Sequence, residues 1–202
     1  MKYLVTHFYS KTEIPFLKLN FLEGKKYVDK FVFVEFNYSK RGAKKKFVDL
    51  HSQSIFTDDE FEQILYFKVD LNEEIKDASD DTDEHRTTMA IHNEPLFRSY
   101  FTRLVNFQND DIIISVDADE IIHEESYNYI LNYMKINDAL LLKMNMFYYR
   151  LDYLSNEVWT SPIAMKYKYG KNIYDVRKMG GKTNYPQWRK CSMTSNVKVS
   201  SI

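Results

Sequence analysis

Four short apolar runs of strand length lie along the chain, separated by amphipathic segments. They occupy residues 3–6, 31–36, 64–69 and 112–116. Continuous apolar runs of this length are typical of strands that are buried on both faces of a sheet. Between them, apolar residues recur at helical spacing, so the order along the chain is strand, helix, strand, helix. This order predicts an α/β fold in which a mostly parallel, twisted sheet is flanked by helices.

Local signals predict where the helices begin and end. Thr12 is expected to cap a helix that stops at Gly24, because a threonine hydroxyl accepts hydrogen bonds from the free N–H groups of a first turn. Residues 57–60 form a capping-box pattern before a short helix. Two further helices are expected on either side of the fourth run, one over about residues 95–105 and one ending near residue 134.

The remaining segments are assigned from composition and pattern. Residues 70–84 are acidic and lack periodicity, which predicts a surface loop. Residues 140–149 and 159–167 predict two longer strands joined by a polar turn. Because no internal repeat or low-complexity linker occurs, we expect one domain over residues 1–179 and an irregular tail over residues 180–202.

Composition excludes several classes of protein. Among 202 residues, 44% are hydrophobic and 28% are charged, which is typical of a globular chain. The net charge of −1 argues against nucleic-acid binding, and the single Cys191 excludes a disulfide framework or a cysteine-rich zinc site. No apolar run approaches the roughly 20 residues that span a bilayer, and the N-terminus lacks a signal-peptide pattern. We therefore expect a cytoplasmic protein without a membrane span.

A cluster of carboxylates follows the fourth run directly. Asp117, Asp119 and Glu120 lie at the carboxyl end of this predicted strand, where open α/β sheets bind their ligands. Carboxylate oxygens are the ligands that Mg²⁺ and Mn²⁺ prefer, and these ions also hold substrate phosphates. The pattern predicts a metal site with Asp117 and Asp119 as ligands. The alternative is that these acidic residues only stabilise the first turn of the next helix.

Four segments together resemble glycosyltransferase family 17, whose best-known members are β-1,4-mannosyl-glycoprotein N-acetylglucosaminyltransferases. The most specific segment is DDIIISVDADEII, at residues 110–122, which contains a D-x-D motif. The others are VDKFVFVEFNYSKRGAKKKF at 28–47, NEPLFRSYFTRLVNF at 93–107 and LLKMNMFYYRLDYLSNEVW at 141–159. The resemblance covers roughly residues 1–168 of the chain.

The resemblance implies a single GT-A-like domain with the D-x-D at the carboxyl end of a strand. It implies an inverting glycosyltransferase that moves a sugar from a nucleoside-diphosphate donor, with a UDP-sugar favoured, to a glycan acceptor. The implied cofactor is Mn²⁺ or Mg²⁺. The alternative is a nonenzymatic sugar- or nucleotide-binding module derived from such an enzyme, because the G-W-H-x-S segment of the family does not occur in this sequence.

The donor is expected to contact the carboxyl ends of the first two strands. Thr6, His7 and Phe8 close the first strand, where the resemblance places the nucleoside base; a satisfied buried histidine is the alternative for His7. The resemblance also suggests that Glu35 and Asn37 border the nucleotide. A structural role is nearly as favoured for Glu35, because a carboxylate that ends a buried strand needs hydrogen-bond partners.

Two more residues and a basic run complete the expected donor side. Arg98 fits either the diphosphate or an aspartate of the metal site, because a guanidinium binds both bidentately, and a solvated helix arginine is the alternative. Glu120 is expected to support the metal ligands Asp117 and Asp119 or to orient the donor sugar. A basic run over residues 40–46 could attract a diphosphate or an anionic glycan, although most such runs are solvated.

The catalytic base is expected in the chain after the D-x-D. An inverting displacement needs a carboxylate that removes the proton of the acceptor hydroxyl. Asp152 and Glu157 flank a turn beside aromatic residues, where an acceptor sugar could stack. Glu157 is favoured because it adjoins Trp159, and an ordinary surface acid is the alternative for each.

Overall fold

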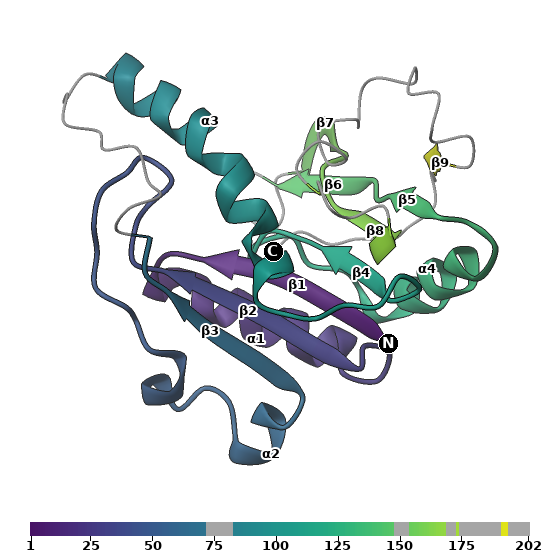
Figure 1. Ribbon diagram of the computed structural model, residues 1–202. Coiled ribbons are helices and arrows are strands. Elements are labelled where there is room, and N and C mark those ends of the chain that lie inside the picture. The colour runs from purple at the N-terminus through teal and green to yellow at the C-terminus, as the bar shows by residue number, and fades with distance from the viewer. Residues whose placement is uncertain (72–82, 148–153, 169–172, 174–190, 194–202) are drawn as a thin grey trace.

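The computed structural model of the chain describes residues 1–71, 83–147, 154–168, 173 and 191–193 (Figure 1). The strands are β1 Lys2–Phe8, β2 Lys30–Phe36, β3 Ile64–Val69, β4 Ile112–Ser115, β5 Ala139–Leu141, β6 Met144–Phe147, β7 Leu154–Trp159, β8 Ile163–Lys166 and β9 Cys191–Met193. The helices are α1 Ile14–Gly24, α2 Asp58–Phe61, α3 Asp83–Ser99 and α4 Glu124–Ile136. Short 3-10 turns occupy Lys11–Glu13, Leu50–Gln53 and Tyr100–Arg103.

Seven of these strands form one mixed sheet in the order β3-β2-β1-β4-β8-β5-β9. Within the group β1 to β4, every pair of neighbouring strands is parallel. The strand β8 runs antiparallel to both β4 and β5. The strands β6 and β7 pair separately as an antiparallel hairpin. The predicted α/β class and mostly parallel sheet are confirmed. Since β2, β1 and β4 are parallel neighbours, their carboxyl ends meet at one edge of the sheet.

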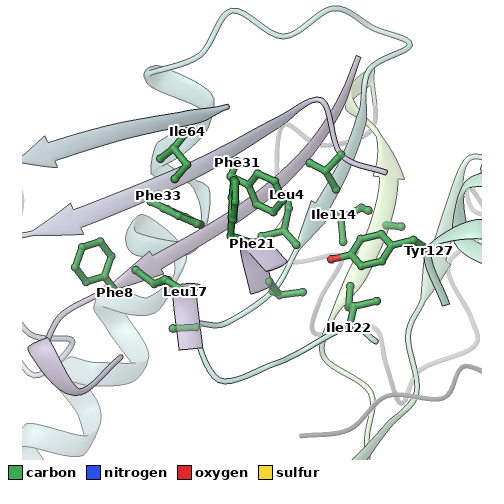
Figure 2. Close-up of a cluster of buried hydrophobic side chains, with 14 of the residues drawn as sticks. Leu4, Phe8, Leu17, Phe21, Phe31, Phe33, Ile64, Ile114, Ile122 and Tyr127 are labelled. Atoms are coloured by element: carbon green, nitrogen blue, oxygen red, sulfur yellow. The ribbon is translucent and has the colours of Figure 1, made fainter. Parts of the chain in front are cut away.

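Two apolar layers hold the sheet between helices on its two faces. Alternate residues of β1 point to opposite faces, so that Leu4 and Phe8 pack toward α1 and α4 while Tyr3 and Val5 pack toward α3. Figure 2 shows the first layer, and Figure 1 shows α1 and α3 on opposite sides of the strands. Tyr127 of α4 completes the first layer and is fully buried.

The ends of α1 show which local signals were interpreted correctly. The helix stops at Gly24 as predicted, and a Cβ atom there would lie 2.8 Å from the Tyr127 hydroxyl, so the close packing of α4 requires a glycine. The predicted cap at Thr12 is wrong, because a 3-10 turn occupies Lys11–Glu13 before the helix begins. Within that segment Glu13 accepts hydrogen bonds from the backbone N–H groups that precede it.

The prediction was least accurate around prolines. Pro95, expected to mark a helix start or a kink, lies inside α3, and this helix already includes positions 83 and 84 of the expected acidic loop. The first predicted long strand, 140–149, is broken into β5 and β6, the second, 159–167, is shortened to β8, and β7 lies largely in the segment expected to be a polar turn. At the break between β5 and β6 the Leu142 N–H donates to the Pro162 carbonyl over 2.9 Å, and Pro162 itself has no N–H to continue a ladder.

The segment expected to be an irregular tail contains one strand in its described part, β9, which pairs parallel with β5 at the edge of the sheet. The domain boundary near residue 180 stays a prediction. None of the described helices combines the length and the apolar character that a membrane crossing requires.

Candidate functional site

A pocket of about 440 Å³ lies at the edge of the sheet where the ends of β1 and β4 meet the turn that follows β2. The chain therefore brings three segments, far apart in sequence, to the position where open α/β sheets bind ligands. The lining residues are His7, Tyr9, Glu13, Ser39, Lys40, Arg41, Asp117, Ala118 and Asp119.

Asp117, the first aspartate of the D-x-D, is paired with an arginine from α3. Arg98 donates through Nη1 and Nη2 to the two carboxylate oxygens of Asp117 over 2.5 and 2.7 Å. Arg98 also donates through Nε to Glu94 over 2.7 Å, and only 8% of its surface is exposed. Burial alone would lower the pKa of Arg98, but the adjacent Asp117 and Glu94 carboxylates outweigh it and raise the pKa. The guanidinium therefore stays charged.

Asp119, the second aspartate, is exposed and lines the pocket. Within the part of the chain that the structure describes, its carboxylate makes no hydrogen bond or ion pair. The two aspartates thus differ in their availability, since the carboxylate of Asp117 is held by Arg98 whereas that of Asp119 is free to bind a ligand.

Glu120 is buried behind the pocket and closes the D-x-D turn. Its Oε2 accepts the Asp117 backbone N–H over 2.5 Å, and its Oε1 accepts the indole N–H of Trp159. Both oxygens are therefore used, and Glu120 does not line the pocket. Through this carboxylate, the end of β7 is attached to the D-x-D turn.

The described residues contain no cluster of three or more histidine, cysteine or acidic side chains that could hold a metal by itself. The D-x-D offers a smaller donor set, the free Asp119 beside the occupied Asp117. Mg²⁺ commonly uses one or two carboxylates and completes its shell with water and substrate phosphates. The residues present fit an ion of this kind, which brings phosphate ligands with it.

Of the three residues expected at the end of β1, only His7 lines the pocket. Phe8 has no exposed surface and belongs to the apolar layer on the α1 side, as Figure 2 shows. Thr6 is also buried, and strand alternation places it on the same side as Phe8. Tyr9, two residues after His7, lies on the same face and also lines the pocket. The His7 and Tyr9 rings meet edge to face with centroids 5.3 Å apart.

Glu35 and Asn37 lie outside the pocket and make structural hydrogen bonds. The fully buried Glu35 accepts from the backbone N–H groups of residues 48 and 49 and from the Tyr66 hydroxyl. Burial, together with the hydrogen bond to Glu35, raises the pKa of Tyr66. Asn37 donates to Asp70 over 2.6 Å and accepts from the Leu71 N–H over 3.0 Å. These residues fix the chain on both sides of the turn that follows β2.

Sequence reasoning missed Tyr9 and Glu13 and treated Lys40 and Arg41 only as part of a basic run. The signal for Tyr9 was its position two residues after His7, which continues the same face of β1. Its hydroxyl is buried and, among the described residues, without a hydrogen-bond partner. Burial and the nearby Asp117 raise the pKa of Tyr9 well above its ordinary value.

The two candidates for the catalytic base stay predictions. Asp152 lies outside the described residues, and for Glu157 the structure describes only the backbone, within β7. The β7 strand pairs with β6 so that Trp159 lies opposite Met144. Trp159 is 40% exposed, which leaves part of its ring surface accessible beside the D-x-D turn.

Comparison with known proteins agrees with this arrangement. The family model of glycosyltransferase family 17 matches residues 5–193. No curated protein matches the chain. Among solved structures, the crystal structure of S. aureus TarS 1-349 is similar, with a TM-score of 0.51 at 12% identity. That alignment covers 98% of this chain and 59% of the TarS chain, so this chain spans less than two thirds of that TarS chain.

A second similar structure is the galactosyltransferase LgtC in complex with donor and acceptor sugar analogs, at a TM-score of 0.44 and 10% identity. The alignment covers 94% of this chain and 65% of LgtC. The likeness to TarS concerns the fold, and the fold is of the GT-A type, as predicted.

Proposed function

Because the chain belongs to glycosyltransferase family 17, we propose that it transfers a sugar from a nucleoside-diphosphate donor to a glycan acceptor. We propose a UDP-sugar as the favoured donor, inversion at the anomeric carbon, and Mn²⁺ or Mg²⁺ as the cofactor. The observation that carries this proposal is the free Asp119 carboxylate in a pocket at the carboxyl edge of the sheet, beside an aspartate already paired with Arg98.

The D-x-D would hold the cation through Asp119, with Asp117 in support. A bound divalent cation supplies positive charge that stabilises the departing diphosphate. Arg98 neutralises Asp117, so the pocket carries less negative charge than the sequence suggests, and a diphosphate anion enters it at lower electrostatic cost. The His7 and Tyr9 rings line the β1 side of the pocket and meet edge to face, so a nucleoside base could pack against an aromatic ring there.

The acceptor would bind on the β7 side of the D-x-D, where Trp159 is partly exposed. A carboxylate there takes the proton of the acceptor hydroxyl. The hydroxyl oxygen attacks the anomeric carbon of the donor as the bond from that carbon to the diphosphate breaks. Glu157 is our preferred base, because it precedes Trp159 by two positions in a strand, and Asp152 is the second choice.

Calorimetric titration of UDP-sugars with and without Mn²⁺ tests the donor and metal assignments. Asp119→Asn should lose the Mn²⁺-dependent part of donor affinity, because it removes the charged ligand with little change in shape. The matched control is Asp110→Asn, since Asp110 is exposed near the opposite end of β4 and should bind donor normally. Unchanged Mn²⁺-dependent affinity in Asp119→Asn would exclude this site.

Activity then separates an enzyme from a binding module. Release of UDP in the presence of glycan acceptors, or slow hydrolysis of the donor, is expected of the wild-type chain. Donor binding with neither reaction would instead identify the nonenzymatic module. For the base, Glu157→Gln should keep donor binding and lose transfer, and normal turnover in that variant would remove Glu157 from the list.

A further inference from the structure

The turn that follows β2, residues 38–44, contributes two cations, Lys40 and Arg41, to the pocket that the D-x-D also lines. We propose that this basic turn binds the diphosphate of the donor through Arg41, with Lys40 as its neighbour. The proposal rests on the proposed function, since it requires a nucleoside-diphosphate ligand, and it assigns a residue that the D-x-D argument does not include.

The basic turn is closed by its own hydrogen bonds. Tyr38 and Lys44 form an antiparallel bridge, and the Ser39 N–H donates to the Ala43 carbonyl over 2.9 Å. The Gly42 N–H donates back to the Ser39 carbonyl over 2.9 Å, and Gly42 has a φ of 84°, a backbone conformation that favours glycine. These bonds hold the backbone from which the two cationic side chains at the tip extend.

Helix α3 anchors the basic turn against the pocket. Asn93, only 3% exposed, donates through its side-chain amide to the Lys40 carbonyl over 3.1 Å. The Lys40 ammonium lies 4.0 Å from a Glu94 oxygen and 5.9 Å from the centre of the Tyr9 ring. The same Glu94 accepts from Arg98, which holds Asp117. The last two turns of α3 thus hold both the basic turn and the D-x-D.

A charge inventory of the pocket identifies the groups that remain available. Asp117 is neutralised by Arg98, Glu13 accepts two backbone N–H groups, and Lys40 lies near Glu94. Among the described residues, neither the exposed Arg41 nor the exposed Asp119 forms an ion pair. Among the described lining residues, Arg41 is therefore a cation and Asp119 an anion without a hydrogen-bond or ion-pair partner, while the Glu13 carboxylate, also without an ion pair, is held by backbone N–H groups.

This pair of charges suits a metal-bound diphosphate better than a simple anion or a simple cation. Asp119 would attract the metal, while Arg41 would donate to phosphate oxygens, which a planar guanidinium can bind bidentately. A neutral nucleoside would leave both charges unused. The other lysines of the basic run differ in position, because Lys44 lies over the Tyr38 ring and neither Lys44 nor the exposed Lys46 lines the pocket.

The test compares Arg41→Gln with Lys46→Gln, which remove the same charge from neighbouring positions of the same segment. The ligands are the nucleoside diphosphate that the wild-type chain binds most tightly among UDP, GDP and CDP, then its monophosphate, then its nucleoside. Affinities are measured with Mn²⁺ at fixed ionic strength. Arg41→Gln should weaken diphosphate binding by roughly tenfold or more, the monophosphate by less, and the nucleoside not at all. Lys46→Gln should change each affinity by less than about twofold.

Two results would contradict the proposal in distinguishable ways. Equal diphosphate affinities in the wild type and Arg41→Gln, or equal losses for diphosphate and nucleoside, would overturn the role of the basic turn and leave the proposed function standing. Failure of the wild type to bind any nucleoside diphosphate would overturn the proposed function itself, and the basic turn with it. Because Arg41 is exposed, thermal unfolding of the variant should match the wild type and serves as the folding control.

Discussion

The two faces of the sheet differ in how they are held together. On the face covered by α1 and α4, the layer is mainly apolar, with isolated buried polar contacts such as that of Glu35 with Tyr66, and rings such as Phe31 and Phe33 are fully buried. On the face covered by α3, the apolar layer gives way at the carboxyl edge to a polar network of Asn93, Glu94 and Arg98. The first face stabilises the fold, and the second also arranges the pocket. Substitutions on the two faces should therefore have different consequences for stability and ligand binding.

The largest effect on stability is expected from Phe31→Ala on the α1 face. Phe31 has no exposed surface and packs against Phe21 and Phe33 with ring centroids 4.9 and 6.1 Å away (Figure 2). Removing the ring should lower the free energy of unfolding by about 4 kcal/mol, measured by urea denaturation. Donor affinity of the folded fraction should be unchanged, because Phe31 lies at the opposite end of β2 from the pocket. A specific loss of donor binding would show that the two faces are not independent.

The next effect is expected from Arg98→Met on the α3 face. Methionine keeps much of the volume but removes the charge that Asp117 and Glu94 share, so two partly buried carboxylates lose their partner. We expect a loss of about 3 kcal/mol in the free energy of unfolding, together with loss of donor binding under conditions where the protein stays folded.

A double-mutant cycle with Asp117→Asn sharpens that prediction. The two substitutions should be strongly non-additive, because each removes the same ion pair. Arg103→Met, at an exposed arginine just beyond α3, is the control. It should change neither the free energy of unfolding nor donor binding appreciably. Additive effects of Arg98→Met and Asp117→Asn would mean that the ion pair contributes little.

The smallest effect is expected from Tyr9→Phe, at the pocket beside the polar network. The hydroxyl is buried and has no hydrogen-bond partner among the described residues, and its raised pKa keeps it neutral at ordinary pH. Its removal should change the free energy of unfolding by less than about 0.5 kcal/mol, because no hydrogen bond is lost. The difference in midpoint temperature of thermal unfolding between Tyr9→Phe and the wild type should be the same at pH 7 and pH 9. A large destabilisation would reveal a partner for the hydroxyl.

The same contrast explains how far the sequence could predict the structure. The four apolar runs predicted β1 to β4 because burial on both faces produces a local pattern in the sequence. The D-x-D could be placed at a strand end for the same reason. The pairing of Arg98 with Asp117 was one of several alternatives, since the partners are 19 positions apart and no periodicity connects them.

Contacts between more distant positions had no signal at all. The hydrogen bond from Asn93 to Lys40 joins residues 53 positions apart, and without it a basic run resembles any solvated surface. The family resemblance and the sheet-edge position made Glu35 a candidate for ligand contact, but its hydrogen-bond donors lie 13, 14 and 31 positions away and only the folded chain shows them. Proline was also ambiguous, because Pro95 inside α3 carries the same local signal as a proline at a helix start.

The attachment of both pocket walls to the end of α3 has a thermodynamic consequence. A ligand that shifts the basic turn acts on Asn93 and Glu94, and one that shifts the D-x-D acts on Arg98, so each ligand biases the same helix. Binding of a ligand at the basic turn is then expected to change the affinity of the D-x-D for its own ligand. Linkage requires the reverse effect to have the same factor. The last turns of α3 would make cation and nucleotide cooperative ligands rather than independent ones.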